Sequence, residues 1–255
     1  MTKIYGIISG KGGVGKTTSA INLAAAINSL NKQALVVDAN LSTPNVGLHL
    51  GAPLLPITLN HVLNNKAKLE EAIYEHESGL KILPSALSPN KVNYQKLPQI
   101  SNKLRKLSYH VIFDSSAGIG EEVEAVVNSA DEIILVTQAE MPAITDALKA
   151  LKIAKKAGKD IRGFILTRHK GRKSEMSLEN IKDMLELPLL GIIPEDRKVQ
   201  KSLSMKNAII NTHPNSKTSK SYKKIAKKII ERIKDEDDGD DQQESTESFL
   251  KRLFK

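Results

Sequence analysis

A glycine-rich run near the N-terminus carries the residue types best suited to chemistry. Residues 10–17 read Gly-Lys-Gly-Gly-Val-Gly-Lys-Thr and satisfy the pattern G-x-x-x-x-G-K-[ST]. Glycines let the main chain turn so that successive N–H groups face the same phosphate oxygens, and the following helix points its N-terminus at them. In this pattern Lys16 neutralises the terminal phosphates and the Thr17 hydroxyl binds Mg²⁺.

The run therefore predicts a site for ATP and Mg²⁺. Its position between a strand and a helix argues against the alternative of an ordinary glycine-rich turn. The loop residues expected to bind the nucleotide are Gly10, Lys11, Gly12, Gly13, Val14, Gly15, Lys16, Thr17 and Thr18.

Two aspartates stand at the ends of apolar strands farther along the chain. Asp38 follows two valines, and Asp114 follows the run Val-Ile-Phe. Alone, each would be interpreted as a helix cap or a turn residue. Ligand sites in open α/β sheets, however, lie at the carboxyl ends of the strands, where these acids would meet the glycine-rich loop. We therefore expect both aspartates to belong to the nucleotide site.

The elements that must position these side chains alternate between strand and helix. Continuous Ile, Val and Leu runs predict buried strands, and apolar residues three and four apart predict the helices between them. The predicted strands are 3–9, 33–38, 80–83, 110–114, 132–137, 161–167 and 189–193, and the helices include 17–30, 142–157 and 219–233. This order indicates an α/β fold, a mostly parallel twisted sheet with helices on both faces.

Composition narrows the functional classes. The chain has 255 residues, 40% of them hydrophobic, which is enough for one large globular domain. There is no cysteine, which excludes disulfides, thiolate zinc sites and iron–sulfur clusters. The six histidines show no ligand spacing, so we expect no metal besides Mg²⁺. No apolar stretch approaches the ~20 residues of a membrane span; we expect a cytoplasmic protein.

Charge divides the chain into three parts. Without the eight acids of residues 235–247 and the three cations of the last seven residues, the net charge of +9 becomes +14 for residues 1–234. We expect an ATPase domain over 1–234, an acidic flexible linker over 235–247 and an amphipathic tail over 248–255. The basic domain would be attracted to anionic membrane or nucleic acid, although lysines that merely solvate helices would give the same count.

The tail has the pattern of an interfacial membrane helix. Its apolar groups fall on one helical face and its cations on the other. The residues expected to contact the membrane are Phe249, Leu250, Lys251, Arg252, Leu253 and Phe254. The alternative is a helix that docks on its own domain or in a partner's groove.

A second lysine in the glycine-rich loop, Lys11, is not required by the general pattern. The run from Lys11 to Thr18 resembles the deviant Walker A motif of the MinD/ParA family of ATPases, and the resemblance extends over about residues 1–234. It implies a homodimer with ATP sandwiched between the subunits, in which Lys11 reaches the partner's nucleotide. It also implies Mg²⁺ held by Thr17, Asp38 and Asp114, and catalysis by Lys11, Lys16, Asp38 and Asn40.

Three positions depart from the family's motifs. Asn40 stands where the family usually has a second aspartate that positions the attacking water, so we expect slow hydrolysis. Ser116 replaces a proline after Asp114. In the pair that resembles the adenine-flanking Asn-Arg, threonine precedes Arg168 in place of asparagine. Pro194 and Glu195 resemble the loop that lies beside the adenine.

The resemblance implies a MinD-like ATPase that cycles between cytosol and the inner face of the cell membrane and positions a cellular structure, with an activating protein partner. One alternative is a ParA-like ATPase that binds DNA nonspecifically and would not need the apolar tail. Another is a flagellar-number ATPase of the MinD type. A metabolic P-loop kinase would leave Lys11 and the tail unexplained.

Overall fold

A single eight-stranded sheet forms the centre of the chain in the computed structural model, which describes residues 2–87 and 93–231. The strand order is β3-β4-β2-β5-β1-β6-β7-β8; β3 runs antiparallel to β4 and all other neighbours are parallel. The strands are β1 (Ile4–Ile8), β2 (Ala34–Asp38), β3 (Tyr74–Glu75), β4 (Lys81–Leu83), β5 (His110–Asp114), β6 (Glu132–Thr137), β7 (Asp160–His169) and β8 (Leu189–Pro194).

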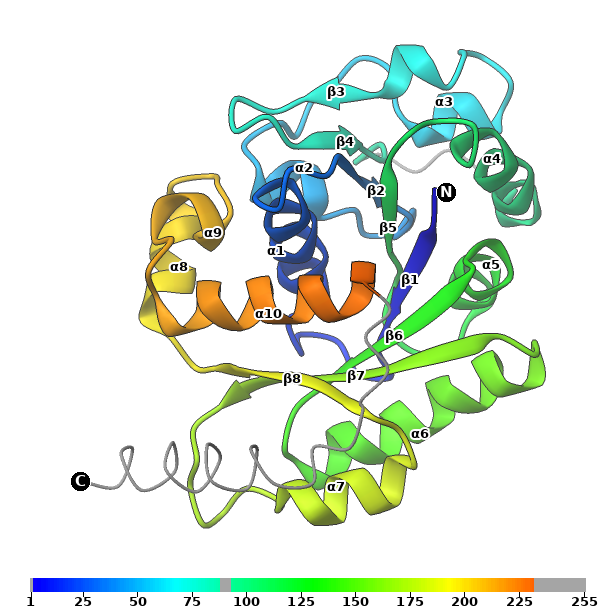
Figure 1. Ribbon diagram of the computed structural model, residues 1–255. Coiled ribbons are helices and arrows are strands. Elements are labelled where there is room, and N and C mark those ends of the chain that lie inside the picture. Colours follow the sequence, from blue (N-terminus) through cyan, green and yellow to red (C-terminus); the bar gives the residue numbers. More distant parts are fainter. Residues whose placement is uncertain (1, 88–92, 232–255) are drawn as a thin grey trace.

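Helices cover both faces of this sheet (Figure 1). One hydrophobic core lies under α1 (Lys16–Asn28), α2 (Val46–His49), α9 (Ile209–Thr212) and α10 (Lys217–Glu231). The other lies under α3 (Leu59–Leu63), α4 (Leu97–Leu104), α5 (Glu121–Ser129), α6 (Met141–Lys156) and α7 (Leu178–Leu185). The short α8 (Arg197–Ser204) and the turns η1 (Glu70–Ala72) and η2 (Tyr94–Lys96) complete the described elements.

The central strands are apolar along most of their length because both of their faces are covered. Every residue of β1, β2 and β6 is buried. Such strands read as continuous Ile, Val and Leu runs, since neither face meets water. Strand β1 lies at the middle of the sheet, between β5 and β6, so the loop that leaves its carboxyl end lies at the centre of one sheet edge.

That loop enters α1, which is held firmly. Every residue of α1 from Ser19 to Ile27 is buried. On its outer side α1 packs against α10, where the Ser19 hydroxyl lies 3.1 Å from the hydroxyl of the fully buried Tyr222. Burial raises the pKa of Tyr222 to about 12, so the phenol stays neutral in this contact. The N-terminus of α1 therefore has a fixed place at the sheet edge.

The predicted α/β fold is confirmed, and most strand limits differ from the prediction by a residue or two. The antiparallel β3 was not predicted, because two half-exposed residues carry no periodic signal. The predicted linker at 235–247 and tail at 248–255 lie outside the described residues. No helix in the described ranges is long and apolar enough to cross a membrane.

Gly10 sets how closely the loop crosses α6. A Cβ atom at this position would overlap the main-chain carbonyl of Asp146 in α6. We expect Gly10→Ala to lower the free energy of unfolding by ~1–3 kcal/mol, the usual cost of forcing extra atoms into a packed contact. Chemical denaturation of the full chain measures it.

Gly120→Ala is the matched control for this prediction. A Cβ atom at Gly120 meets nothing within 4 Å, and the residue has an extended conformation that alanine adopts readily. Equal stability of the two variants would show that the contact with α6 is not constrained.

Candidate nucleotide-binding site

The glycine-rich loop has the backbone of a phosphate cradle. Gly13 and Gly15 have φ angles of 78° and 91°, a conformation that side chains disfavour. In the described part of the chain, none of the main-chain N–H groups of residues 11–18 donates a hydrogen bond to another protein group. These donors stay paired only if a ligand or water accepts from them. The loop can therefore bind phosphate oxygens.

A neighbouring strand supports the cradle from below. The Thr167 hydroxyl at the end of β7 is buried and donates to the Val14 carbonyl, with 2.5 Å between the oxygens. In the sequence this threonine stands where the resembling motif has an adenine-flanking asparagine. In the structure its hydroxyl bonds to the Val14 carbonyl, so Thr167 ties the glycine-rich loop to the end of β7.

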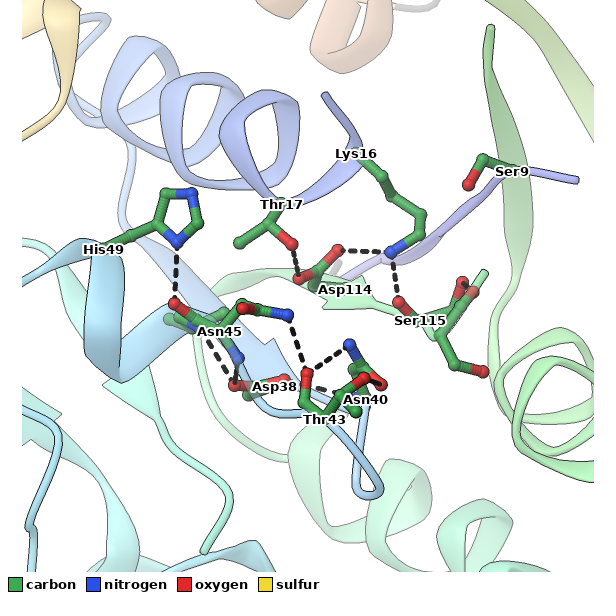
Figure 2. Close-up of polar contacts among 12 residues, drawn as sticks. Ser9, Lys16, Thr17, Asp38, Asn40, Thr43, Asn45, His49, Asp114 and Ser115 are labelled. Carbon is green, nitrogen blue, oxygen red and sulfur yellow. Dashed lines mark hydrogen bonds and ion pairs between the residues drawn. The ribbon is translucent and has the colours of Figure 1, made fainter. Parts of the chain in front are cut away.

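Lys16 and Thr17 both meet the carboxylate of Asp114 (Figure 2). The Lys16 ammonium lies 3.2 Å from one Asp114 oxygen and also donates to the Ser115 carbonyl. The Thr17 hydroxyl donates to the other Asp114 oxygen at 2.5 Å. Lys16 is only 8% exposed and Asp114 is fully buried. The lysine, hydroxyl and carboxylate that the sequence assigned to phosphate and magnesium are thus in direct contact.

Asp38 adds a second buried carboxylate. It ends β2 directly beside Asp114, its register partner at the end of β5. The pKa of Asp38 is raised to about 8, mainly by complete burial and further by the neighbouring Asp114 carboxylate. The N–H groups of Val46, Asn45 and Asn40 bond to the Asp38 carboxylate and lower its pKa. Asp38 therefore also caps α2, the structural role that we weighed for it from the sequence.

This arrangement fits Mg²⁺ bound together with a nucleotide. Two buried carboxylates repel each other, and a divalent cation beside them would remove that cost. Mg²⁺ in such sites takes one or two carboxylates, with water and substrate phosphates completing its shell. In agreement, residues 2–87 and 93–231 contain no group of three acidic, histidine or cysteine side chains that could hold a metal alone. Thr17, Asp38 and Asp114 are the residues placed to hold it.

Asn40 does not direct its amide to the glycine-rich loop. Its Nδ2 donates to the Thr43 carbonyl at 2.5 Å, and its Oδ1 accepts from the Thr43 hydroxyl at 3.0 Å (Figure 2). Both polar atoms of the side chain are thus used within the loop between β2 and α2. These two contacts leave the second N–H of the amide and one lone pair of its oxygen for a water molecule or a ligand.

Lys11 has a different partner from the other lysine of the loop. Its ammonium lies 3.5 Å from a carboxylate oxygen of Glu140, just before α6, and its side chain is 42% exposed. The two lysines of the loop therefore occupy different environments. Lys16 is buried against the Asp114 carboxylate, whereas Lys11 lies at the surface.

The residues expected beside the adenine come together at the ends of β7 and β8. Arg168 is exposed and has a φ angle of 50°, unusual for a residue with a side chain. Pro194 pairs with His169 in the sheet, and the Glu195 N–H donates to the His169 carbonyl at 3.0 Å. The Glu195 carboxylate lies 3.3 Å from the Lys170 ammonium. The three predicted residues thus share one corner of the sheet edge.

Sequence reasoning missed two residues that touch this region. Ser42, in the loop after β2, donates to the carboxylate of Glu122 in the first turn of α5. Acids are common in the first turn of a helix, so Glu122 does not indicate a site by its position in the sequence. One sequence feature could have indicated that Glu122 is buried. It lies next to Val123, on the side of α5 that faces the core.

Comparison with known proteins agrees with this geometry. The family model described as the CobQ/CobB/MinD/ParA nucleotide binding domain matches residues 5–210. The chain is 37% identical over 227 residues to an uncharacterized ATP-binding protein of Methanocaldococcus jannaschii, covering 88% of this chain and 86% of that protein. It is 30% identical to the antiactivator FleN of Pseudomonas aeruginosa, covering 89% and 86%. It is 29% identical to the septum site-determining protein MinD of Buchnera aphidicola over the whole of both chains.

Solved structures give the same result. The septum site-determining protein MinD from Pyrococcus horikoshii, complexed with Mg-ADP, superposes with a TM-score of 0.86 at 35% identity, covering 91% of this chain and 97% of that one. MinD in the MinC:MinD complex of Aquifex aeolicus superposes with a TM-score of 0.82 at 26% identity, covering 90% and 96%. The chain therefore belongs to the CobQ/CobB/MinD/ParA nucleotide-binding family and is an ATPase of the MinD/ParA type.

Proposed function

We propose that the chain is a MinD-like ATPase that dimerises on Mg–ATP, associates with the membrane through its tail and is released by hydrolysis. The separation of the two loop lysines is the observation that carries this proposal. One lysine faces the buried carboxylates of its own subunit, whereas the other is held at the surface, where a second subunit could meet it.

Each part of the site has a distinct task in nucleotide binding. The N–H groups of residues 11–18 donate hydrogen bonds to the phosphate oxygens, and Lys16 exchanges part of its contact with Asp114 for the phosphates. Thr17 and Asp114 hold the magnesium shell, with Asp38 behind them. Mg²⁺ held by these residues would offset the charge that develops on the phosphates. Arg168, Pro194 and Glu195 flank the base.

The dimer supplies what one subunit lacks. Lys11 lends a cation to the partner's nucleotide, as an arginine finger does, and the charge is absent until the subunits meet. Two apolar side chains are exposed near the same edge, each to 55%: Ile119 lies in the loop after β5, and Met141 begins α6 beside Glu140. A second subunit that covers this edge would bury them.

The membrane step depends on avidity. Burying the four large apolar side chains of the tail contributes at most ~6–12 kcal/mol. Ordering about ten residues at ~1–2 kcal/mol each offsets most of that, and cations near anionic lipid add ~1 kcal/mol each. One tail is therefore marginal, whereas two tails on one dimer bind ~10²-fold tighter or more. Dimerisation would in this way place the protein on the inner face of the cell membrane.

Relatives indicate which kind of process the ATPase serves. MinD proteins are named for determining the septum site, and the Aquifex aeolicus protein forms a complex with MinC. We therefore infer a role in spatial positioning, with a protein partner that stimulates hydrolysis. A flagellar-number ATPase of the MinD type is the alternative form of this role, and one relative, FleN, is named an antiactivator.

One observation favours a second candidate, nonspecific DNA binding. The solvent face of α10 carries six lysines and a single acid, Glu231. Lysines three and four residues apart repel one another, so this face would gain from an anionic partner. Retardation of duplex DNA by the Mg–ATP form, abolished by salt, would favour this candidate, whereas equal mobility with and without protein would remove it.

Lys11 should matter for hydrolysis and not for nucleotide binding in the single subunit. We expect Lys11→Ala to lower kcat by ~10³-fold, the smaller end of what an arginine finger contributes, while affinity for Mg–ADP changes little. Steady-state phosphate release and titration with fluorescent ADP measure the two quantities. Lys152→Ala, in α6, is the control. If Lys11→Ala hydrolyses ATP at the wild-type rate, Lys11 does not act across a dimer.

The tail should be required for membrane association in the ATP state. We expect a chain cut after Glu244 to lose co-sedimentation with anionic vesicles in Mg–ATP while keeping its nucleotide affinity. ADP should release the full chain from the same vesicles. Equal sedimentation of the cut and the full chain with ATP would show that another surface is the anchor.

A further inference from the structure

Glu122 is a buried carboxylate that nucleotide binding does not explain. The residue is 8% exposed, in the first turn of α5. One carboxylate oxygen accepts a hydrogen bond from the Ser42 hydroxyl, and the other is buried without a partner among the described residues. Removing a carboxylate from water is costly unless it is paired and fully hydrogen-bonded. A half-satisfied carboxylate at this position therefore calls for a reason.

Ser42 connects this carboxylate to the loop that contains Asn40. The loop is fixed at its base, where the Ala39 N–H donates to the Asp114 carbonyl at 2.9 Å and the Ser85 hydroxyl donates to the Asp38 carbonyl at 2.6 Å. Farther out, Asn40 and Thr43 bond to each other. The exposed Ser42 is the part of the loop that reaches α5, and its hydroxyl also lies 3.5 Å from the hydroxyl of Tyr94.

The other end of the contact belongs to the second loop of the site. Helix α5 begins six residues after Ser115, whose carbonyl accepts from Lys16. The Ser42–Glu122 contact therefore joins the two loops that leave β2 and β5, the strands that end in Asp38 and Asp114. Both loops border the place where the terminal phosphate would lie. A contact between them restricts how far they can separate.

We propose that Glu122 is a positioning residue: through Ser42 it holds the loop of residues 39–45 against the loop after Asp114 in the arrangement from which ATP is hydrolysed. The inference rests on the proposed nucleotide chemistry and deepens it. Small displacements of groups around a reacting phosphate cost large factors in rate, because alignment supplies much of the acceleration. The free Glu122 oxygen can accept one further hydrogen bond when the loops close on a nucleotide.

An ordinary helix-start acid is the competing explanation, and the chain contains its control. Glu121 precedes Glu122 in the same first turn and would stabilise the helix dipole equally well. Glu121 is exposed and forms no hydrogen bond or ion pair within the described ranges. A purely helical role predicts that the two glutamates behave alike, whereas a positioning role predicts that they differ.

Two substitutions from opposite ends of the contact test the proposal. We expect Ser42→Ala and Glu122→Gln each to lower kcat by about 10- to 100-fold with KM for ATP changed less than about twofold. Glu121→Gln and Ser174→Ala, at an exposed turn, should keep wild-type values. The double variant S42A/E122Q should be no slower than the slower single variant, because both remove one interaction. Ser42 is exposed, so its alanine variant should fold even if Glu122→Gln does not.

Hydrogen exchange gives a readout that does not need hydrolysis. With Mg–ADP bound, amides of residues 39–46 should exchange faster in Ser42→Ala than in the wild type, while those of β6 stay unchanged. Unchanged exchange in this loop together with unchanged kcat would overturn the role of Glu122. A wild-type chain that neither binds nor hydrolyses ATP would instead contradict the proposed function, and faster exchange without nucleotide would still support the contact.

Discussion

Compensation of charge at one sheet edge is the constraint on which the structure depends. The N–H groups of residues 11–18 have no acceptor in the described chain and suit an anion, and the buried Asp38 and Asp114 suit a cation. Lys16 offsets one of the two acids, but the pKa of Asp38 remains raised, mainly by burial and then by Asp114. A magnesium nucleotide satisfies both demands at once, since its phosphates accept from the loop while its metal faces the carboxylates.

The rest of the fold holds the N–H groups of the loop and the two carboxylates in fixed positions relative to each other. Strand β1 delivers the loop at the middle of the sheet, and α1 is buried on all sides against the sheet and α10. Thr167 supports the loop from β7. The loops after β2 and β5 are tied through Ser42 and Glu122. At the surface, Lys11 pairs with Glu140, and the exposed Met141 follows Glu140 in the chain.

The fold could be predicted from the periodic pattern of apolar residues, and the glycine-rich loop from the spacing of its glycines and lysine. The apolar strand runs and the G-x-x-x-x-G-K-[ST] pattern need no tertiary information. The contacts that complete the site have no such signal. The sequence does not tell that the Asn40 side chain bonds to Thr43, or that the Thr167 hydroxyl bonds to Val14. These contacts depend on loop paths that are set by packing elsewhere in the chain. Glu122 was overlooked for the same reason: an acid at a helix start is ambiguous until its burial is known.

The most direct test of the account is the mass of the full chain in solution, measured by light scattering with saturating Mg²⁺ and a non-hydrolysable ATP analogue. The account predicts twice the mass of the 27.9 kDa chain with the analogue, and a single-chain mass with ADP. A single-chain mass under both conditions, with nucleotide bound, would contradict the claim that the second lysine serves a partner's phosphates.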